Sequence, residues 1–400
     1  MLSEPLPAAL RPPEPLGADL LSHWLLDPSV TYLNHGHFGG VPRVVLEAQF
    51  EWRRRIESNP IELLERRRNE LLEQARRSLG AFIGAEPANL GFVTNTTNGV
   101  NAVVRSIGFE PGDELLTTNH VYNAVRQTMR HVAERAGATF IEAPVPVPID
   151  SPRQVIEAID RALTDRTRLL AVSHITSPTA VQFPLEGIIE LCTQRGVDVL
   201  VDGAHAPGMV EIDLERTAAS YYVGNLHKWV CAPKGSAFLW VRPDRQPGIH
   251  PTTISHYLDQ GFAEEFSWQG TRDITGWLCV GEAIDFMARF GWDRVRRHNH
   301  ELAVWTQALL CERWSVEPIT PADGSMIGSM TTVPLPEGAR RYGSVVDFQA
   351  ALLERHHIEV PIIDWDHRWF VRASCQIYNT PSQYERLTEA VLEVVGGSDQ

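Results

Sequence analysis

Short apolar runs that alternate with helical patterns constrain the fold of this chain most strongly. Residues 169–173 (Leu-Leu-Ala-Val-Ser) and 197–201 (Val-Asp-Val-Leu-Val) are nearly continuous apolar segments, which are typical of strands buried on both faces of a parallel sheet. Such alternation predicts an α/β fold with a largely parallel sheet, which binds ligands at the carboxyl ends of its strands. Further strand-like segments lie at residues 90–93, 114–117, 139–142, 221–223 and 237–241, and helical segments at 152–162 and 185–195.

Three parts are predicted along the 400 residues of the chain. Residues 1–30 are rich in proline and predict an extended arm that leads into a short helix. Residues 31–285 carry the strand–helix alternation and predict a large domain. Residues 286–400 are more helical, with one or two strands, and predict a smaller α+β domain that packs with the arm.

The composition argues against several classes of protein. A formal net charge of −14 argues against nucleic-acid or anionic-membrane partners, because both require clustered positive charge. No apolar run approaches the ~18 residues of a membrane span, and the N-terminus carries no basic-then-apolar signal. The five cysteines are far apart and never paired as CxxC, which indicates a reducing compartment without a disulfide framework or a zinc site. We therefore predict a cytoplasmic protein with no bound metal.

Lys228 is the residue that points most directly to chemistry. The chain has only two lysines, Lys228 and Lys234, whereas arginine supplies its other 34 basic residues. A lysine amine can lose its proton on burial and attack a carbonyl, which a guanidinium cannot do. Lys228 follows a predicted strand that ends in Asp202. An amine to hold an aldehyde and a carboxylate to keep a pyridine nitrogen protonated are what an enzyme using pyridoxal 5′-phosphate (PLP) needs. The alternative is that both lysines are ordinary surface charges.

Four further positions have a functional and a structural interpretation each. Thr96 and Thr97 lie in a turn before a helix predicted to begin near residue 100, where hydroxyls and free N–H groups bind phosphate or a threonine only caps the helix. His120 follows a strand and either stacks on a flat ring or is a core histidine. Arg372 either clamps a carboxylate or forms a structural salt bridge. Asp202 either meets a cation or caps a helix.

Four motifs in order along the chain resemble a known family. They are residues 201–205 (Val-Asp-Gly-Ala-His), 225–228 (Asn-Leu-His-Lys), 270–273 (Gly-Thr-Arg-Asp) and 372–374 (Arg-Ala-Ser) with 378–380 (Tyr-Asn-Thr). Together they resemble the class V aminotransferase-like branch of the fold type I PLP-dependent enzymes, which includes cysteine desulfurases, isopenicillin N epimerases and C–S lyases. Residues 32–39 and 57–60 are similar to the isopenicillin N epimerase-like subgroup. The resemblance implies a fold type I transferase: a large domain with a mostly parallel seven-stranded sheet, a smaller α+β C-terminal domain, and a homodimer with shared active sites.

The resemblance also implies roles for individual residues. Lys228 is the implied Schiff-base lysine, Asp202 the partner of the pyridine nitrogen, and His120 the residue that stacks on the ring. The other implied cofactor contacts are Thr96, Thr97, Ser177, His205, Asn225, His227 and, from the partner subunit, the partner's Thr271. The implied substrate contacts are Arg372 for the α-carboxylate, together with His37, Tyr122 and Asn59.

The sequence leaves the reaction open between two main outcomes. In both, the Lys228 amine removes the Cα proton of an amino-acid substrate. Reprotonation from the opposite face gives an epimerase and needs a second acid, for which His37, Tyr122 and His120 are candidates. Loss of a sulfur group from Cβ gives a C–S lyase acting on a cysteine conjugate or its sulfoxide. Transamination and a non-catalytic PLP-binding protein are further alternatives. The absence of a cysteine shortly before Arg372 argues against a desulfurase, which needs an accessible thiolate there.

Overall fold

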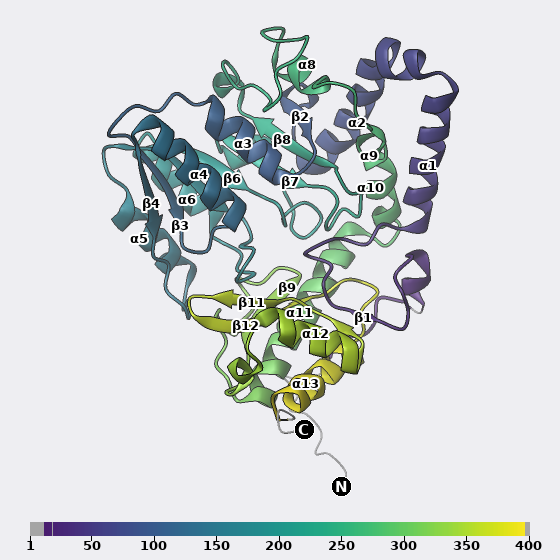
Figure 1. Cartoon of the computed structure of the whole chain (residues 1–400), viewed down its shortest axis with the longest axis vertical. Coiled ribbons are helices and arrows are strands. Elements are labelled where there is room, and N and C mark those ends of the chain that lie inside the picture. The colour runs from purple at the N-terminus through teal and green to yellow at the C-terminus, as the bar shows by residue number, and fades with distance from the viewer. Residues whose placement is uncertain (1–11, 18, 397–400) are drawn as a thin grey trace.

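A seven-stranded sheet forms the centre of the larger part of the molecule, as a computed structural model shows (Figure 1). The structure describes residues 12–17 and 19–396, so part of the predicted N-terminal arm lies outside the described residues. Every strand runs parallel except β8, which is antiparallel to both of its neighbours. This confirms the predicted, mostly parallel seven-stranded sheet. In spatial order the strands are β2 (Leu90–Val93), β8 (Ala237–Val241), β7 (Tyr221–Asn225), β6 (Asp198–Asp202), β5 (Thr167–Ser173), β3 (Glu114–Thr118) and β4 (Thr139–Ala143).

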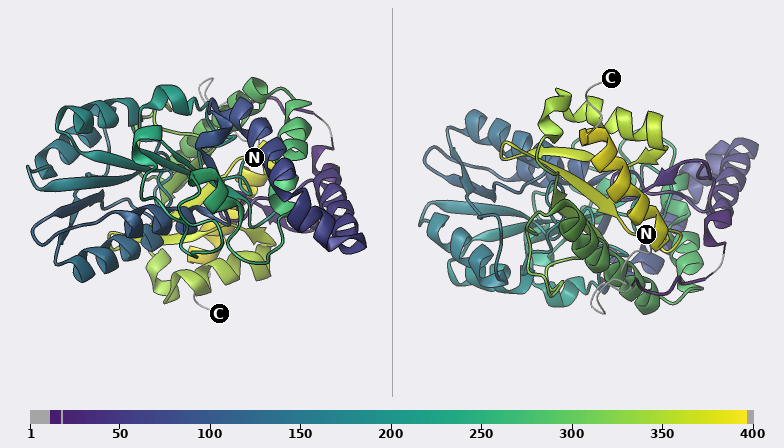
Figure 2. Two further views of the ribbon diagram at one scale, coloured as in Figure 1. Left: turned by 90° about the horizontal axis from the view of Figure 1, so that it is seen from above. Right: turned by 90° about the horizontal axis from the view of Figure 1, so that it is seen from below.

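The apolar runs of the sequence form strands because both faces of the sheet are buried. Alternate residues of β5 enter two different clusters: Leu169 packs with α3 and α4, whereas Leu170 packs with α5 and α6. Helices therefore cover both faces (Figure 2), as expected for parallel strands without a polar side. The helices of this part are α1 (Arg43–Ser58), α2 (Arg68–Ile83), α3 (Thr96–Ser106), α4 (Asn123–Ala136), α5 (Pro152–Ala162), α6 (Leu185–Gln194), α7 (Leu214–Thr217), α8 (Phe262–Ser267), α9 (Thr275–Leu278) and α10 (Val280–Ala288).

A smaller part built from the C-terminal residues lies beneath the large sheet in the view of Figure 1. Its three-stranded antiparallel sheet has the order β11 (Ile362–Trp365), β12 (Arg368–Ser374) and β9 (Met330–Pro334). Apolar side chains of this sheet pack with α11 (Trp292–Trp314), α12 (Val345–His356) and α13 (Pro381–Gly396) in one cluster. Near the N-terminus, β1 (Thr31–Tyr32) pairs in parallel with β10 (Ile358–Glu359), and Leu33 is buried in that cluster. The predicted boundaries at residues 30 and 285 stay a prediction.

Short irregular helices complete the described chain. Residues 62–66 form one π-helical turn (Glu62–Arg66) between α1 and α2. The 3₁₀ turns are Leu20–His23, Pro87–Asn89, Pro243–Arg245 and Ala339–Tyr342. Within residues 12–17 and 19–396, no helix combines the length and the apolar character needed to cross a membrane.

One predicted boundary was wrong. The helix predicted to begin near residue 100 begins at Thr96. Asn95 supplies the N-cap, because its side chain accepts a hydrogen bond from the N–H of Asn98 at 2.9 Å. The polar residues 96–99 that suggested a turn are therefore the first turn of α3, where capped backbone N–H groups tolerate weak helix formers.

Candidate active site

A cavity of about 570 Å³ opens where the parallel strands end. Its walls come from the segments that follow β2, β3, β5, β6 and β7, and from β12 of the smaller sheet. This is the position at which open α/β sheets bind ligands. The cavity brings together most of the predicted site residues: His37, Thr96, Thr97, Tyr122, Ser177, Asp202, His205, Asn225, His227, Lys228 and Arg372.

Lys228 stands in this cavity beside His205. The Lys228 Nζ lies 3.1 Å from His205 Nε2, and Trp229 Nε1 lies 3.5 Å from His205 Nδ1. An indole N–H only donates, so His205 Nδ1 accepts, and the neutral ring carries its proton on Nε2 and donates it to the lysine nitrogen. Burial and the Arg372 guanidinium lower the pKa of Lys228 to about 7, against the opposing effect of Asp202. Burial and the Lys228 charge hold the pKa of His205 well below its usual value. Lys228 is thus an amine that is free to react near neutral pH.

Asp202 is the last residue of β6, and its side chain lines the cavity. It is buried, and its Oδ1 accepts a hydrogen bond from the N–H of Ala204 at 3.0 Å. Burial raises the pKa of this carboxyl, while the Ala204 N–H and the Lys228 charge act in the other direction. A buried carboxylate in this state gains from a cationic partner in the cavity.

The start of α3 offers donors at one end of the cavity. Thr96 and Thr97 both line it, and Asn95 rather than either threonine caps the helix. The N–H of Thr96 donates to Asn225 Oδ1 at 3.0 Å, which ties the end of β7 to the helix. The Thr97 hydroxyl and the helix N-terminus therefore face the cavity with partial positive charge, an arrangement suited to phosphate.

His227 lies at the same end of the cavity. Its Nδ1 donates to the Ser236 carbonyl at 3.0 Å. Burial and the Lys228 charge lower the pKa of His227 to about 4, so the ring is neutral in the free protein and presents its Nε2 to the cavity.

Arg372 enters the cavity from β12, on the smaller sheet. Its Nη1 donates to two acceptors of Ser177, the backbone carbonyl and, at 3.3 Å, the side-chain hydroxyl. Arg372 Nε is buried and has no hydrogen-bond partner among the described residues. Although burial lowers the pKa of Arg372 to about 10, the group is cationic at neutral pH. A carboxylate in the cavity would meet this positive charge.

Three predicted residues are not brought to the cavity. His120 is fully buried behind it, with Nδ1 2.7 Å from the Thr179 hydroxyl and its ring 4.5 Å from that of Trp365. Asn59 ends α1, and its side chain accepts from the N–H of Glu62. Thr271 is exposed.

For His120, the core-histidine interpretation describes its present contacts, and Tyr122 is the residue of that segment that lines the cavity. The functional roles of these three residues stay predictions.

The sequence did not identify several lining residues. Lys234 is the most informative of them. The scarcity of lysine in the sequence was the available signal for it, because both lysines of the chain line this one cavity. The place of the remaining additions depends on the tertiary fold: Gly36, Phe38, Thr94, Asn95, Ile175, Ala204, Gly235, Gln349, Pro361, Ile362 and Ile363.

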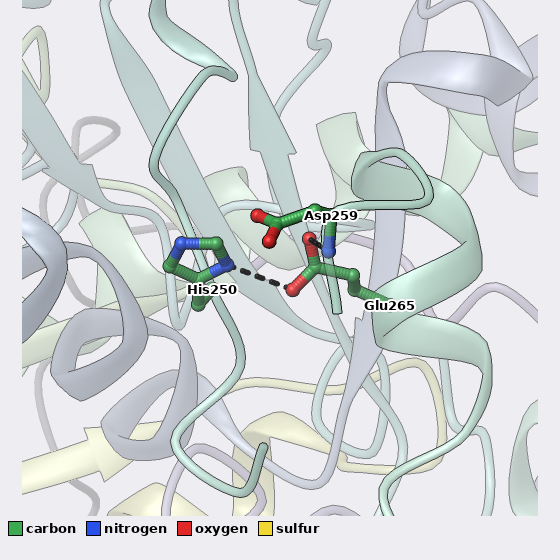
Figure 3. A group of neighbouring side chains, drawn as sticks. All are labelled: His250, Asp259 and Glu265. Atoms are coloured by element: carbon green, nitrogen blue, oxygen red, sulfur yellow. Dashed lines mark hydrogen bonds and ion pairs between the residues drawn. The ribbon is translucent and has the colours of Figure 1, made fainter. Parts of the chain in front are cut away.

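A cluster of possible metal ligands lies outside the cavity (Figure 3). His250, Asp259 and Glu265 each bring one ligand atom within 4.8 Å of the others. However, His250 Nδ1 lies 2.8 Å from one Glu265 oxygen, and the other oxygen accepts from the N–H of Asp259 at 3.1 Å. The buried carboxylate is thus used to hold the 250–265 stretch, and hydrogen bonding accounts for the cluster without an ion.

The residues present fit PLP. Lys228 supplies an amine, Asp202 a buried carboxylate for a pyridine nitrogen, and the start of α3 a phosphate site. The guanidinium of Arg372 brings a positive charge for a substrate carboxylate to the same cavity. Lys228, Lys234 and Arg372 face a single acidic residue among the described lining residues, Asp202, so the cavity favours anionic ligands.

Comparisons with known proteins agree with this geometry. Residues 39–387 match the family model of class-V aminotransferases. Isopenicillin N epimerase from Amycolatopsis lactamdurans is 36% identical over 387 residues, which cover 92% of this chain and 96% of that protein. A putative L-cysteine desulfhydrase from Oryza sativa subsp. japonica is 31% identical and covers 92% of this chain and 84% of its own length. Among solved structures, cysteine desulfurase from Thermococcus onnurineus NA1 is similar with a TM-score of 0.79 at 21% identity, over 97% of this chain and 100% of that one.

These comparisons do not bear out the argument against a desulfurase. Solved cysteine desulfurases share the fold, and at that level of identity the similarity concerns the fold alone. The structure adds that no cysteine is among the described residues that line the cavity, and that Cys375 and Cys231 are buried.

Proposed function

Because the chain belongs to the class V aminotransferase family and uses PLP as its cofactor, we propose that it removes the Cα proton of an amino-acid substrate and returns a proton to the opposite face, as an isopenicillin N epimerase-like enzyme. The observation that carries the proposal is the meeting of Lys228, Asp202 and Arg372 in one cavity. When bound, PLP supplies an electron-withdrawing ring that stabilises negative charge at Cα.

Arg372 orients the substrate in this proposal. Its guanidinium lines the cavity and is cationic at neutral pH, so it binds the α-carboxylate. Ser177 holds Nη1 and so fixes the plane of the guanidinium. A carboxylate held bidentately by a fixed guanidinium leaves few orientations for Cα.

Lys228 holds the aldehyde of PLP and serves as the base that takes the Cα proton. With a pKa of about 7, the amine accepts a proton readily near neutral pH, which is the range in which general bases are most effective. Asp202 would hold the proton on the pyridine nitrogen.

Epimerisation needs a second proton donor at the cavity, and Tyr122 is the best candidate. Tyr122 lines the cavity with 44% of its surface exposed there and to solvent. His37 also lines it, but burial and the charges of Arg372 and Lys228 lower the pKa of His37, so little imidazolium is present at neutral pH. His120 has no access to the cavity.

A C–S lyase is the second candidate. The L-cysteine desulfhydrases among the relatives support it, and elimination of a sulfur group from Cβ needs Lys228 but no second acid. Transamination and PLP binding without turnover are the remaining alternatives. The presence together of Lys228, Asp202, His205 and Arg372 supports a catalyst over a binding protein.

The deciding experiment incubates the PLP-loaded protein with L- and D-amino acids and with cysteine conjugates in D₂O. Inversion at Cα supports the epimerase, release of pyruvate and ammonia together with the sulfur leaving group supports the lyase, and dependence on a 2-oxo acid supports transamination. Tyr122→Phe should stop inversion while Lys228 still exchanges the Cα proton for deuterium. Lys228→Ala should stop every reaction. If borohydride reduction does not leave a pyridoxyl group on the peptide that contains Lys228, the whole assignment fails.

We also infer a homodimer with shared active sites. Large apolar side chains are exposed on the single chain, among them Phe50 at 62% and Ile61 at 54%, and a subunit interface would remove such side chains from water. Thr271 is exposed as well, where a residue that reaches a neighbouring subunit has to be. Light scattering on the eluted protein should give twice the mass of one chain, and a monomer would remove the proposed role of Thr271.

A further inference from the structure

A short segment of the N-terminal part, residues 34–40, lies directly against the backbone that carries Lys228. Gly36, His37 and Phe38 of this segment line the cavity. A Cβ on Gly39 would lie 2.6 Å from the carbonyl oxygens of His227 and Lys228 and 2.9 Å from Lys228 Cα. Only glycine permits so close an approach, so any movement of the 34–40 segment changes the wall of the cavity next to Lys228.

Hydrogen bonds hold both ends of the 34–40 segment. His35 Nε2 donates to the Lys228 carbonyl at 3.0 Å, and the N–H of Gly36 donates to the Ser374 hydroxyl at 3.0 Å. The Tyr32 hydroxyl donates to the Phe38 carbonyl at 2.6 Å. These contacts hold residues 35, 36 and 38 of the segment.

Lys234 makes the corresponding contact at the other side. Although Lys234 is an exposed residue, its Nζ donates to the Gly39 carbonyl at 2.6 Å. The same side chain lines both the active-site cavity and a neighbouring groove of about 320 Å³ bounded by Gly40 and Val41. The Lys234 side chain therefore lies between the active-site cavity and the neighbouring groove, and it binds the 34–40 segment, which borders both.

His37 and Phe38 form the surface that this partition supports. Their rings are stacked, with centroids 4.4 Å apart and planes 19° from parallel. Phe38 is 59% exposed, which is unusual for a phenylalanine at a polar cavity and leaves its ring available to a ligand. The apolar residues Pro361, Ile362 and Ile363 line the same cavity.

We propose that Lys234 is a positioning residue: its ammonium holds the Gly39 carbonyl and thereby sets the place of the stacked His37 and Phe38 rings, which form the wall that meets the substrate side chain. The inference rests on the proposed function for its substrate, an amino acid whose side chain is uncharged and at least partly apolar. The position of the 34–40 segment itself does not depend on that function.

The first test is independent of activity. Lys234→Met keeps the length of the side chain and removes the donor, so amide hydrogen exchange in the peptide covering residues 34–40 should rise about tenfold, the scale of one lost charge-assisted hydrogen bond. Lys234→Arg, which keeps a charged donor, should restore much of the protection. Arg53→Met is the matched control, because Arg53 lines the neighbouring groove and binds Asp273 instead of the 34–40 segment. Unchanged exchange in Lys234→Met overturns the proposal.

The second test separates positioning from direct cofactor binding. An absorbance titration with PLP should give an affinity for Lys234→Met within about threefold of the wild-type value. A loss of tenfold or more with normal exchange would instead make Lys234 a phosphate ligand and overturn the proposal. With an amino acid found active in the screen above, the substitution should raise KM about tenfold and change kcat less than threefold. If no amino acid reacts, the proposed function fails, while exchange and PLP titration still decide the role of Lys234.

Discussion

Lys228 is placed as an amine rather than as an ammonium ion. Burial and the Arg372 guanidinium both disfavour the charged form, and they outweigh the attraction of Asp202. His205 strengthens the arrangement, because its ring donates to the lysine nitrogen in the tautomer that Trp229 selects. Lys228, which the sequence singled out because lysine is rare in this chain, is thus a residue whose pKa the fold lowers into the range needed for reaction.

This placement predicts how the rate of PLP attachment depends on pH. The reactive form is the neutral amine, and a pKa of about 7 makes it roughly a thousand times more abundant at neutral pH than in an ordinary lysine. Because the folded pKa is lowered, the rate should rise tenfold per pH unit below 7 and become level above pH 8. Stopped-flow absorbance on the cofactor-free protein measures it, with Lys228→Ala as the control for Lys234. A rise that continues to pH 10 would contradict the lowered pKa.

At the scale of single residues, the sequence pointed to most of the side chains that line the cavity, but it did not reveal which distant residues contact one another. Residues next to a strand end, such as Asp202 and Lys228, could be placed because parallel strands end at one edge of the sheet. The sequence could not show which of His120 and Tyr122 lines the cavity. The two residues are only two positions apart, and the tertiary fold decides which side chain faces the cavity and which faces the core. The contact of Lys234 with Gly39 joins positions 195 residues apart, and no local pattern reports it.

Among the elements, α3 contributes most to the site. Its first turn presents Thr96 and Thr97 to the cavity only because Asn95 takes over the N-cap. Asn225 joins this turn to the end of β7 by accepting from the N–H of Thr96. The strand and the helix are therefore hydrogen-bonded to one another, and the end of the cavity that we propose for phosphate is formed without a ligand.

Asn95→Ala should weaken both stability and PLP affinity. Loss of the N-cap costs about 1 kcal/mol, and a frayed first turn no longer aligns its N–H groups toward phosphate. Urea unfolding and PLP titration measure the two effects. Ser344→Ala is the matched control, since Ser344 caps α12 in the same way by accepting from the N–H of Asp347. This variant should lose similar stability and bind PLP normally; equal losses of affinity in both would contradict the argument.

Buried Glu114 links β3 to the start of β5. It accepts from the Thr164 hydroxyl at 2.5 Å and from Arg166 Nη2 at 2.6 Å. Although burial opposes the effect, these hydrogen bonds lower the pKa of Glu114 below its usual value. The sequence predicted both strands, but it did not reveal that this charged residue in β3 is buried and paired.

Glu114→Gln should lower the free energy of unfolding at pH 7 by roughly 1–3 kcal/mol, the range for hydrogen bonds to a charged group. A carboxyl with a lowered folded pKa stabilises fully above its unfolded pKa of about 4.3, and this stabilisation disappears as the pH falls through the folded value. The variant should therefore lose less stability than the wild type as the pH falls from about 5 to about 3 in urea unfolding. Glu70→Gln, at an exposed pair with Arg67, should leave stability nearly unchanged, because solvent screens exposed ion pairs.

The whole molecule joins two sheets at one cavity. Asp202 ends β6 and Lys228 follows β7 of the seven-stranded sheet, whereas Arg372 lies in β12 of the three-stranded sheet. The pairing of β1 with β10 brings the chain that precedes the 34–40 segment to the smaller part. The alternation of strands and helices predicted the larger part, whereas the pairing of two-residue strands more than 300 positions apart left no periodic signal to read.

This arrangement predicts two separate increments of thermal stability. PLP binds folded protein and should raise Tm by a few degrees, because saturation at 100 times Kd stabilises by about 2.7 kcal/mol. An amino acid identified by the screen should add a second increment, since its carboxylate engages Arg372. Differential scanning fluorimetry of Arg372→Met should show the first increment and lose the second. Loss of both would mean that Arg372 holds the fold rather than the ligand.

Because the only two lysines both border one cavity, amine-directed reagents have an unusual outcome with this protein. Apart from the terminal amine, a succinimidyl ester or an aldehyde-activated resin finds no side chain to couple except at the reacting centre. Immobilisation through amines would thus block entry of the ligand, and lysine cross-linkers would map the neighbourhood of Lys228 and Lys234 instead of the outer surface. Guanidine-directed chemistry is the appropriate route for attaching probes elsewhere.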